Sequence, residues 1–174
     1  MKRLKHDTII GIIFVLITGS AAHFFYDWSG SRYIVGLFTP VNESVWEHMK
    51  LLFFPMLLYS LIMILKLKED HPCITFSLCP ALCSGILAGT FLIPLFFYAY
   101  TCLLGKDVFI LDIGTFIASV IIAFWLSYKL TLSGRPKSYT LLLCGLVCIL
   151  FVCFLIFTYH PPNMKIFEEY VTQK

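Results

Sequence analysis

Five long apolar stretches constrain this chain more than any other feature. They cover residues 8–28, 43–66, 74–103, 108–129 and 139–159. About 20 helical residues cross a hydrocarbon layer of about 30 Å, so each stretch is long enough to span a membrane. Of the 174 residues, 59% are hydrophobic and 13% are charged, which lies far outside the composition of soluble domains. The sequence therefore predicts one domain, residues 1–174, folded as an all-α, polytopic transmembrane helical bundle with five spans.

The charged residues belong mostly to the predicted loops, so the net charge of +3 reports on membrane orientation and does not indicate a nucleic-acid partner. With the N-terminus inside, the inner segments hold eight basic residues: Lys2, Arg3, Lys5, Lys66, Lys68, Lys129, Arg135 and Lys137. The outer segments then hold five: Arg32, Lys50, Lys106, Lys165 and Lys174. This bias predicts the N-terminus inside and the C-terminus outside. We also expect the first stretch to be retained as a helix, although residues 20–22 resemble a signal-peptide cleavage site.

A block of polar residues, 40–50, runs directly into the second apolar stretch. On a helix, Glu43, Glu47 and Lys50 share one face, and Ser44 and His48 extend it. An ionised side chain turned toward hydrocarbon costs about 2.5 kcal/mol or more. This face should therefore point into the bundle or into a water-filled cavity, and the block marks the place where we expect a functional site.

Within the block, Glu47 and His48 are the predicted catalytic pair, acting as general base and general acid. Glu43 is the third predicted catalytic residue, since a second carboxylate one turn away tunes the protonation of the pair. A simpler interpretation stays open. In it, Glu47 and Lys50 form an i,i+3 ion pair, while Ser44 and Glu47 form a capping box at the start of the helix.

The predicted topology brings further polar residues to the same side of the membrane. His23 lies at the end of the first helix, Asp112 on the fourth, and His160 after the fifth. Imidazole and carboxylate groups are the usual ligands of a zinc-type divalent ion. The candidate metal ligands are His48, His23, His160 and Glu47, and the candidate substrate-binding residues are His23, Asn42, Lys50 and His160. No known zinc motif has this spacing, so chemistry without a metal stays open. We expect Glu47 and His48 to lie near His23 or His160, with His23 the nearer.

Three classes of function remain open. The working hypothesis is a membrane enzyme that hydrolyses or transfers acyl groups on a lipid or lipid-linked substrate at the outer leaflet. The alternatives are a small-solute or ion transporter and a non-catalytic accessory protein. An accessory protein would bind a partner helix through Gly85 and Gly89, which are four residues apart and form a close-packing face.

Cysteine and aromatic residues have simpler interpretations. Five cysteines lie inside apolar stretches, where they behave as small hydrophobic residues: Cys79, Cys83, Cys144, Cys148 and Cys153. The sequence contains no C-x-x-C pair and no Cys/His zinc spacing. Trp28, Trp46 and Tyr159 are predicted to anchor the outer interface.

Three segments carry a resemblance to a known family: 23–30, with His23-Phe24-x-Tyr26-x-Trp28-Ser29-Gly30; 35–51, with Pro40-Val41-Asn42-Glu43-Ser44-Val45-Trp46-Glu47-His48; and Tyr159-His160-Pro161-Pro162. The chain resembles an uncharacterised family of small integral membrane proteins of Gram-positive bacteria, known as a domain of unknown function. The resemblance implies a multi-pass protein of the bacterial cytoplasmic membrane, and it implies no substrate. The chain departs from the family pattern after the double proline, where 166–170 replace the usual ending.

Overall fold

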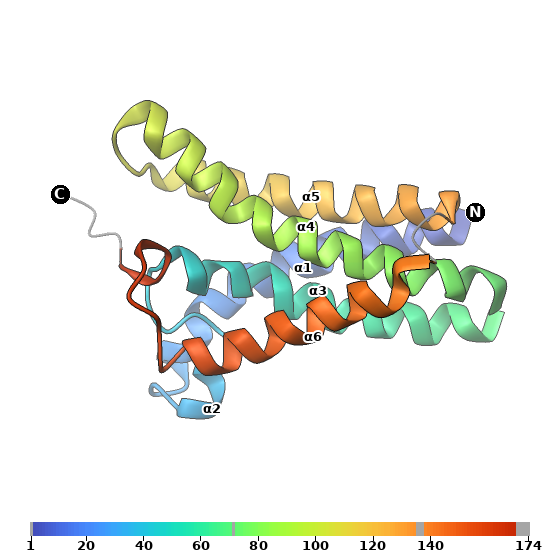
Figure 1. Ribbon diagram of the computed structural model, residues 1–174, viewed down its shortest axis with the longest axis horizontal. Helices are drawn as coiled ribbons and strands as arrows, with labels where there is room; N and C mark the ends of the chain where they lie inside the picture. The colour runs from blue at the N-terminus through green and yellow to red at the C-terminus, as the bar shows by residue number, and fades with distance from the viewer. Residues whose placement is uncertain (1, 71, 135–137, 170–174) are drawn as a thin grey trace.

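The computed structural model describes residues 2–70, 72–134 and 138–169, and in these ranges it consists of helices joined by short loops (Figure 1). The elements are α1 (Lys2–Trp28), α2 (Tyr33–Gly36), α3 (Val45–Asp70), α4 (Pro72–Leu104), α5 (Phe109–Ser133), α6 (Thr140–Phe157) and the short 3-10 helix η2 (Lys165–Phe167). All except α2 and η2 contain a segment long and apolar enough to cross a membrane. The predicted all-α bundle with five apolar spans is confirmed. Its orientation stays a prediction, and Arg135, Lys137 and Lys174 lie outside the described residues.

The helix boundaries differ from the predicted ones mainly at the polar ends. Helix α1 begins at Lys2, ahead of the apolar stretch, and α3 continues to Asp70. The loop between them contains the short helix α2, which is too apolar for an ordinary solvated linker. Pro55 lies inside α3, and Pro80 and Pro94 lie inside α4. Long helices in membrane proteins tolerate proline because neighbouring groups satisfy the freed backbone carbonyls.

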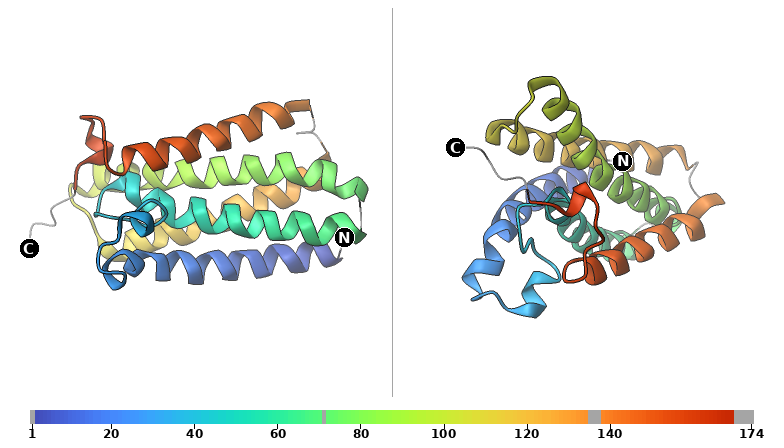
Figure 2. Two further views of the ribbon diagram at one scale, coloured as in Figure 1. Left: turned by 90° about the horizontal axis from the view of Figure 1, so that it is seen from below. Right: turned by 60° about the vertical axis from the view of Figure 1, so that its left-hand side comes forward.

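Four long helices lie side by side in the order α1, α3, α4, α6, and α5 packs across α1 and α4 (Figure 2). The start of α1 and the short helix η2 lie at opposite ends of the bundle (Figure 1). We call the end that carries α2 and η2 the α2 end, and the opposite end the N-terminal end. At the α2 end, α1 and α6 finish, and α3 and α5 begin.

Helix α3 supplies the largest share of the core, which includes its residues Met49, Leu52, Phe53, Met56 and Met63. It is the most buried of the five spans because α1 and α4 flank it. Near the N-terminal end, the hydroxyl of Tyr59 donates a hydrogen bond of 2.6 Å to the backbone carbonyl of Asp7, which joins α3 to α1.

Two glycines set the close approach of α4 and α5. A Cβ atom added to Gly85 would lie 2.5 Å from the Ala123 carbonyl oxygen, and one added to Gly89 would lie 2.6 Å from the Ala123 Cβ. Small residues allow helix backbones to approach this closely. The close-packing face predicted from the sequence is therefore filled by α5 of the same chain. Binding of a partner helix through these two glycines stays a prediction, and α5 of the same chain already packs against both of them.

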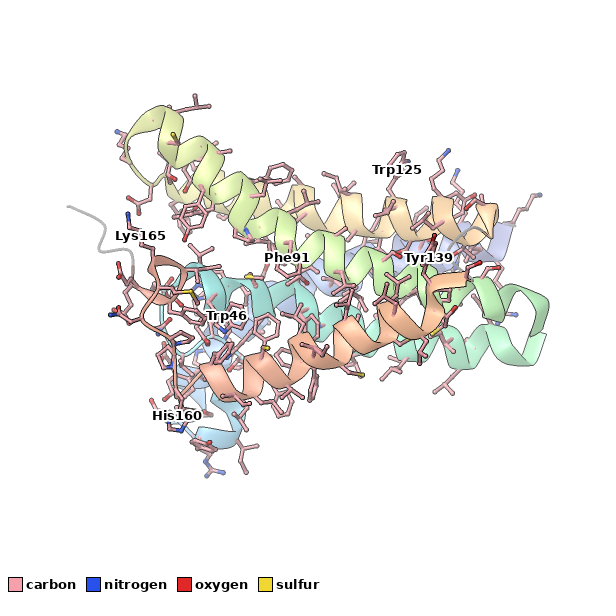
Figure 3. All side chains as sticks on the ribbon, in the orientation of Figure 1. Trp46, Phe91, Trp125, Tyr139, His160 and Lys165 are labelled. Atoms are coloured by element: carbon pink, nitrogen blue, oxygen red, sulfur yellow. The ribbon has the colours of Figure 1, made fainter. Side chains whose placement is uncertain are left out.

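The sequence predicted that Trp46 anchors the outer interface, and this prediction is wrong. The chain after α6 folds back over Trp46 and buries it. The side chain is buried, with 8% of its surface exposed, and packs against Phe154 of α6 and Phe167 of η2. Figure 3 shows Trp46 at the α2 end of the bundle. Trp28, by contrast, is 73% exposed, as an interfacial anchor should be.

Candidate metal centre

The start of α3 determines where the polar block places its side chains. The Ser44 hydroxyl accepts a hydrogen bond of 3.3 Å from the Glu47 backbone N–H, which is one half of the predicted capping box. The other half is absent, because the Ser44 N–H donates to Asn42 Oδ1 at 3.1 Å and the Glu47 carboxylate turns elsewhere. Glu43 thus precedes the helix, and His48 lies in its first turn. The predicted substrate-binding role of Asn42 stays a prediction.

Three side chains converge at this point: His23 from the end of α1, Glu43 from the loop, and His48 from α3. Glu43 Oε2 lies 3.5 Å from His23 Nε2 and 3.3 Å from His48 Nε2. The centroids of the two imidazole rings are 5.4 Å apart. All three ligand atoms lie within 4.8 Å of one another, a separation that a single metal ion can bridge. The prediction that His48 lies near His23 is confirmed, and the same expectation for Glu47 stays a prediction.

The hydrogen bond at the other ring nitrogen defines how His48 faces this cluster. His48 Nδ1 lies 2.9 Å from the backbone carbonyl oxygen of Ser44, which can only accept. Nδ1 therefore carries a proton. Nε2 also faces an acceptor, the Glu43 carboxylate, so either a second proton or a cation must lie between these two atoms. A backbone carbonyl that fixes the tautomer in this way is the usual support for a metal-binding histidine.

A second carboxylate adds to the negative charge around the cluster. Asp112, in the first turn of α5, interacts electrostatically with His48 and with Glu43. The hydroxyl of Tyr100, near the end of α4, donates a short hydrogen bond to Asp112 Oδ1. The sequence placed Asp112 at this depth, but no local pattern identified Tyr100 as its partner. Two carboxylates beside two imidazoles favour the binding of a cation.

Glu43 is the cluster member that lies outside the membrane-spanning segments. Side-chain hydrogen bonds, first with His23 and then with His48, hold the pKa of the Glu43 carboxyl well below its usual range. Its side chain is 62% exposed, while those of His23 and His48 are 33% and 29% exposed. Glu43 is therefore ionised at neutral pH, and the cluster is open to water on one side.

Glu47 and Lys50 form a separate, buried arrangement. Lys50 Nζ lies 2.6 Å from Glu47 Oε2, and it also donates to the Gly36 carbonyl at 3.0 Å and to Thr158 Oγ1 at 2.5 Å. The same Glu47 oxygen accepts the Val41 N–H at 3.0 Å. Glu47 and Lys50 are only 2% and 1% exposed, so the expectation that Glu47 faces the bundle interior is confirmed. The simpler interpretation, an ion pair, is what the structure contains, and the catalytic and substrate-binding roles of these two residues stay predictions.

His160 lies apart from the cluster. It is exposed, follows the end of α6, and is not a member of either group of potential ligands among the described residues. Figure 3 shows it at the edge of the bundle, beyond Trp46. The neighbouring Tyr159 stacks on Tyr33 of α2, with ring centroids 4.2 Å apart. The predicted roles of His160 in binding metal or substrate stay predictions.

The fold and this cluster define a class: a multi-pass helical protein, apolar enough to lie in a membrane, with a histidine and carboxylate cluster at one end. Residues 1–174 match the model of a family described as a family of unknown function (DUF6512). The chain belongs to this family. No curated protein and no solved structure matches it.

Proposed function

We propose that this protein is a metal-dependent hydrolase of the membrane, in which His23, Glu43 and His48 bind a zinc-type ion. One observation carries the proposal: His48 directs Nε2 at the Glu43 carboxylate while its Nδ1 already donates to the Ser44 carbonyl. A divalent cation held by these residues would satisfy both atoms, and His23, on the adjacent helix, would supply a third ligand.

The number and type of ligands favour a catalytic site over a structural one. Structural zinc sites hold the ion with four protein ligands, whereas catalytic sites use three, such as two histidines and one glutamate, and leave a position open. This cluster offers two imidazoles and one carboxylate. The partial exposure of all three side chains gives water and substrate access to the open position.

Asp112 is our candidate for handling protons, because its carboxylate interacts electrostatically with His48. An ion held by these residues would supply Lewis-acid chemistry, polarising a substrate carbonyl and activating water. Asp112 lies within electrostatic range of His48, and the Tyr100 hydroxyl orients its carboxylate. We assign to Asp112 the acceptance of a proton from the attacking water. The sequence-based prediction gave this role to Glu47, whose carboxylate is engaged by Lys50 and Val41.

The surroundings of the cluster favour a lipid or lipid-linked substrate. Phe24 and Trp28 are 52% and 73% exposed and stack on each other, with centroids 5.7 Å apart. The Phe24 ring also contacts the His23 ring. At the start of α5, Phe109 is 77% exposed. Acyl chains of a lipid can lie against these rings while the ester or amide bond of the same lipid reaches the histidine cluster.

The orientation deduced from the basic residues completes the proposal. With the N-terminus inside, the α2 end faces the outer side of what we propose is a bacterial cytoplasmic membrane. Substrates would then come from the outer leaflet. Transport and an accessory role remain the alternatives, and neither requires a bound metal.

Metal analysis of the purified full chain in detergent tests the proposal directly. We expect close to one zinc-type ion per chain, lost in His48→Ala and in Glu43→Gln. His6→Ala is the matched control, because His6 is exposed at the N-terminal end of α1. His160→Ala tests the remaining predicted ligand and should retain the ion.

Hydrolysis is then measured by mass spectrometry on vesicles of phosphatidylglycerol and phosphatidylethanolamine and on lipid-linked esters. Products should form only with the metal-loaded protein. A wild-type protein that binds no metal at any tested concentration would overturn the metal site. Stoichiometric metal without hydrolysis of any ester would overturn the enzyme and leave a non-catalytic metal site.

A further inference from the structure

Three cysteines from two helices meet in the half of the bundle nearer its N-terminal end. Cys79 and Cys83 lie on α4, and Cys144 lies on α6. Cys144 Sγ is 3.8 Å from Cys79 Sγ and 3.6 Å from Cys83 Sγ. All three sulfur atoms lie within 4.8 Å of one another, and all three residues are partly buried. This cluster is separate from the histidine site, which lies at the α2 end.

The placement of these thiols follows from helix geometry. Cys79 and Cys83 are four residues apart, so they share one face of α4, one turn from each other. That face is turned toward α6, because α4 packs against α6 and Cys144 lies in contact with both thiols. Cys102, on the same helix but near its other end, is exposed and belongs to no such group among the described residues.

We propose that Cys79, Cys83 and Cys144 bind one soft, thiolate-preferring d10 ion, Cu(I), in a trigonal site. Soft thiolate ligands select ions of this kind over hard cations. A thiolate bond to a first-row d10 ion is about 2.3 Å long, so three sulfur atoms around one ion lie about 4 Å apart. The Sγ–Sγ separations from Cys144, 3.6 and 3.8 Å, need only a small expansion. Each thiol loses its proton to solvent as the bond to the ion forms, and no atom is oxidised or reduced.

The number of ligands favours Cu(I) over zinc. Zinc in thiolate sites is tetrahedral and takes four ligands. Cys148, one turn beyond Cys144, is exposed and outside the group of three. Under the orientation proposed above, this half of the bundle adjoins the cytoplasm, where thiols stay reduced.

The test is a titration of the purified, reduced full chain in detergent with Cu(I) against a Cu(I) chelator such as bicinchoninate. We expect one Cu(I) per chain, an at least tenfold weaker apparent affinity in Cys83→Ser and in Cys144→Ser, and no change in the matched control Cys102→Ser. His48→Ala should titrate like the wild type, which separates this site from the histidine cluster. X-ray absorption should show three sulfur neighbours.

Two results would overturn the thiol site itself. One is a titration in which Cys83→Ser and Cys144→Ser both behave like Cys102→Ser. The other is a disulfide between two of these cysteines, detected as a mass about 2 Da lower in protein purified without reductant, together with no copper binding after reduction. Stoichiometric zinc with no Cu(I) would overturn the assignment of the ion. Because the two serine variants alter different helices, a folding defect in one leaves the other as the test.

Discussion

His48 and Glu43 face each other across 3.3 Å, with an imidazole nitrogen on one side and a carboxylate oxygen on the other. The second nitrogen of the ring is occupied by the Ser44 carbonyl. A proton and a metal ion are therefore competitors for the same space between the two residues. The pH dependence of metal binding follows from this competition.

Zinc affinity should fall as the pH is lowered below neutral, because protons compete with the ion for the histidine nitrogens. Protonation of Glu43 does not contribute to the change of zinc affinity with pH in this range, because its lowered pKa keeps the carboxylate ionised. Competition with a zinc chelator at several pH values measures the effect. A midpoint near the ordinary pKa of a glutamate would show that the histidines are not ligands.

The metal-free protein should show a separate effect of Glu43 at lower pH. A carboxyl whose pKa is lowered on folding contributes stability that is present above its unfolded pKa, about 4.3, and is lost as the pH falls toward the lowered folded value. Glu43→Gln should therefore be less stable than the wild type near neutral pH and should converge with it in acid. Thermal unfolding with chelator present checks this, and parallel curves for the two proteins would contradict it.

Lys50→Met should be strongly destabilising, by about 3–5 kcal/mol, because it leaves the buried Glu47 carboxylate without its cation. The double variant Lys50→Met with Glu47→Gln should recover part of the loss, since no uncompensated charge remains. Lys66→Met is the matched control on the same helix, at an exposed position. Thermal unfolding in detergent measures all three. Equal stability of Lys50→Met and Lys66→Met would contradict the role assigned to the ion pair.

Gly85→Ala should destabilise the bundle by about 1–3 kcal/mol, because the added methyl group meets the Ala123 backbone carbonyl at 2.5 Å and also the Ser127 hydroxyl. Gly114→Ala on α5 is the control. A Cβ there meets no atom within 4 Å, so this variant should be neutral or slightly stabilising through helix propensity. The same loss of stability in both variants would point to glycine flexibility rather than to α4–α5 contact.

Orientation can be measured with an impermeant thiol reagent on intact cells expressing variants without native cysteines. Lys165→Cys, in η2, should react, and Lys2→Cys, at the start of α1, should be protected until the cells are opened. Both side chains are exposed, so access alone decides the outcome. The opposite pattern would place the histidine cluster on the inner side.

The sequence was sufficient for features that depend on length and periodicity. Five apolar stretches predicted the spans, and the cost of charge in hydrocarbon predicted that Glu47 points inward. Antiparallel neighbours joined by one loop pack together, which predicted the contact between His23 and His48. Each of these inferences uses only local pattern or chain connectivity.

Other features depend on contacts between distant segments and had no local signal. The sequence pattern predicts that the second helix begins at residue 43, whereas α3 begins at Val45, and Glu43 reaches the histidines from the preceding loop. Trp46 is buried because η2 folds back over it. Sequence spacing alone places Cys79 and Cys83 of the thiol cluster on one face of a helix. The third member, Cys144, can be assigned only once α4 and α6 are known to be neighbours.

The hydrogen bond between Lys50 and Thr158 has a consequence for the order in which the protein is made. The two residues are 108 positions apart. Lys50 also binds the Gly36 carbonyl, in the segment that leads to Glu43. A nascent chain that has inserted its first helices already carries His23, Glu43 and His48. Lys50, which holds the loop between α1 and α3, lacks its partner Thr158 until the last span has been made. Competence to bind metal should therefore appear late in biogenesis, and a chain that ends before Thr158 should be membrane-inserted but deficient in the site.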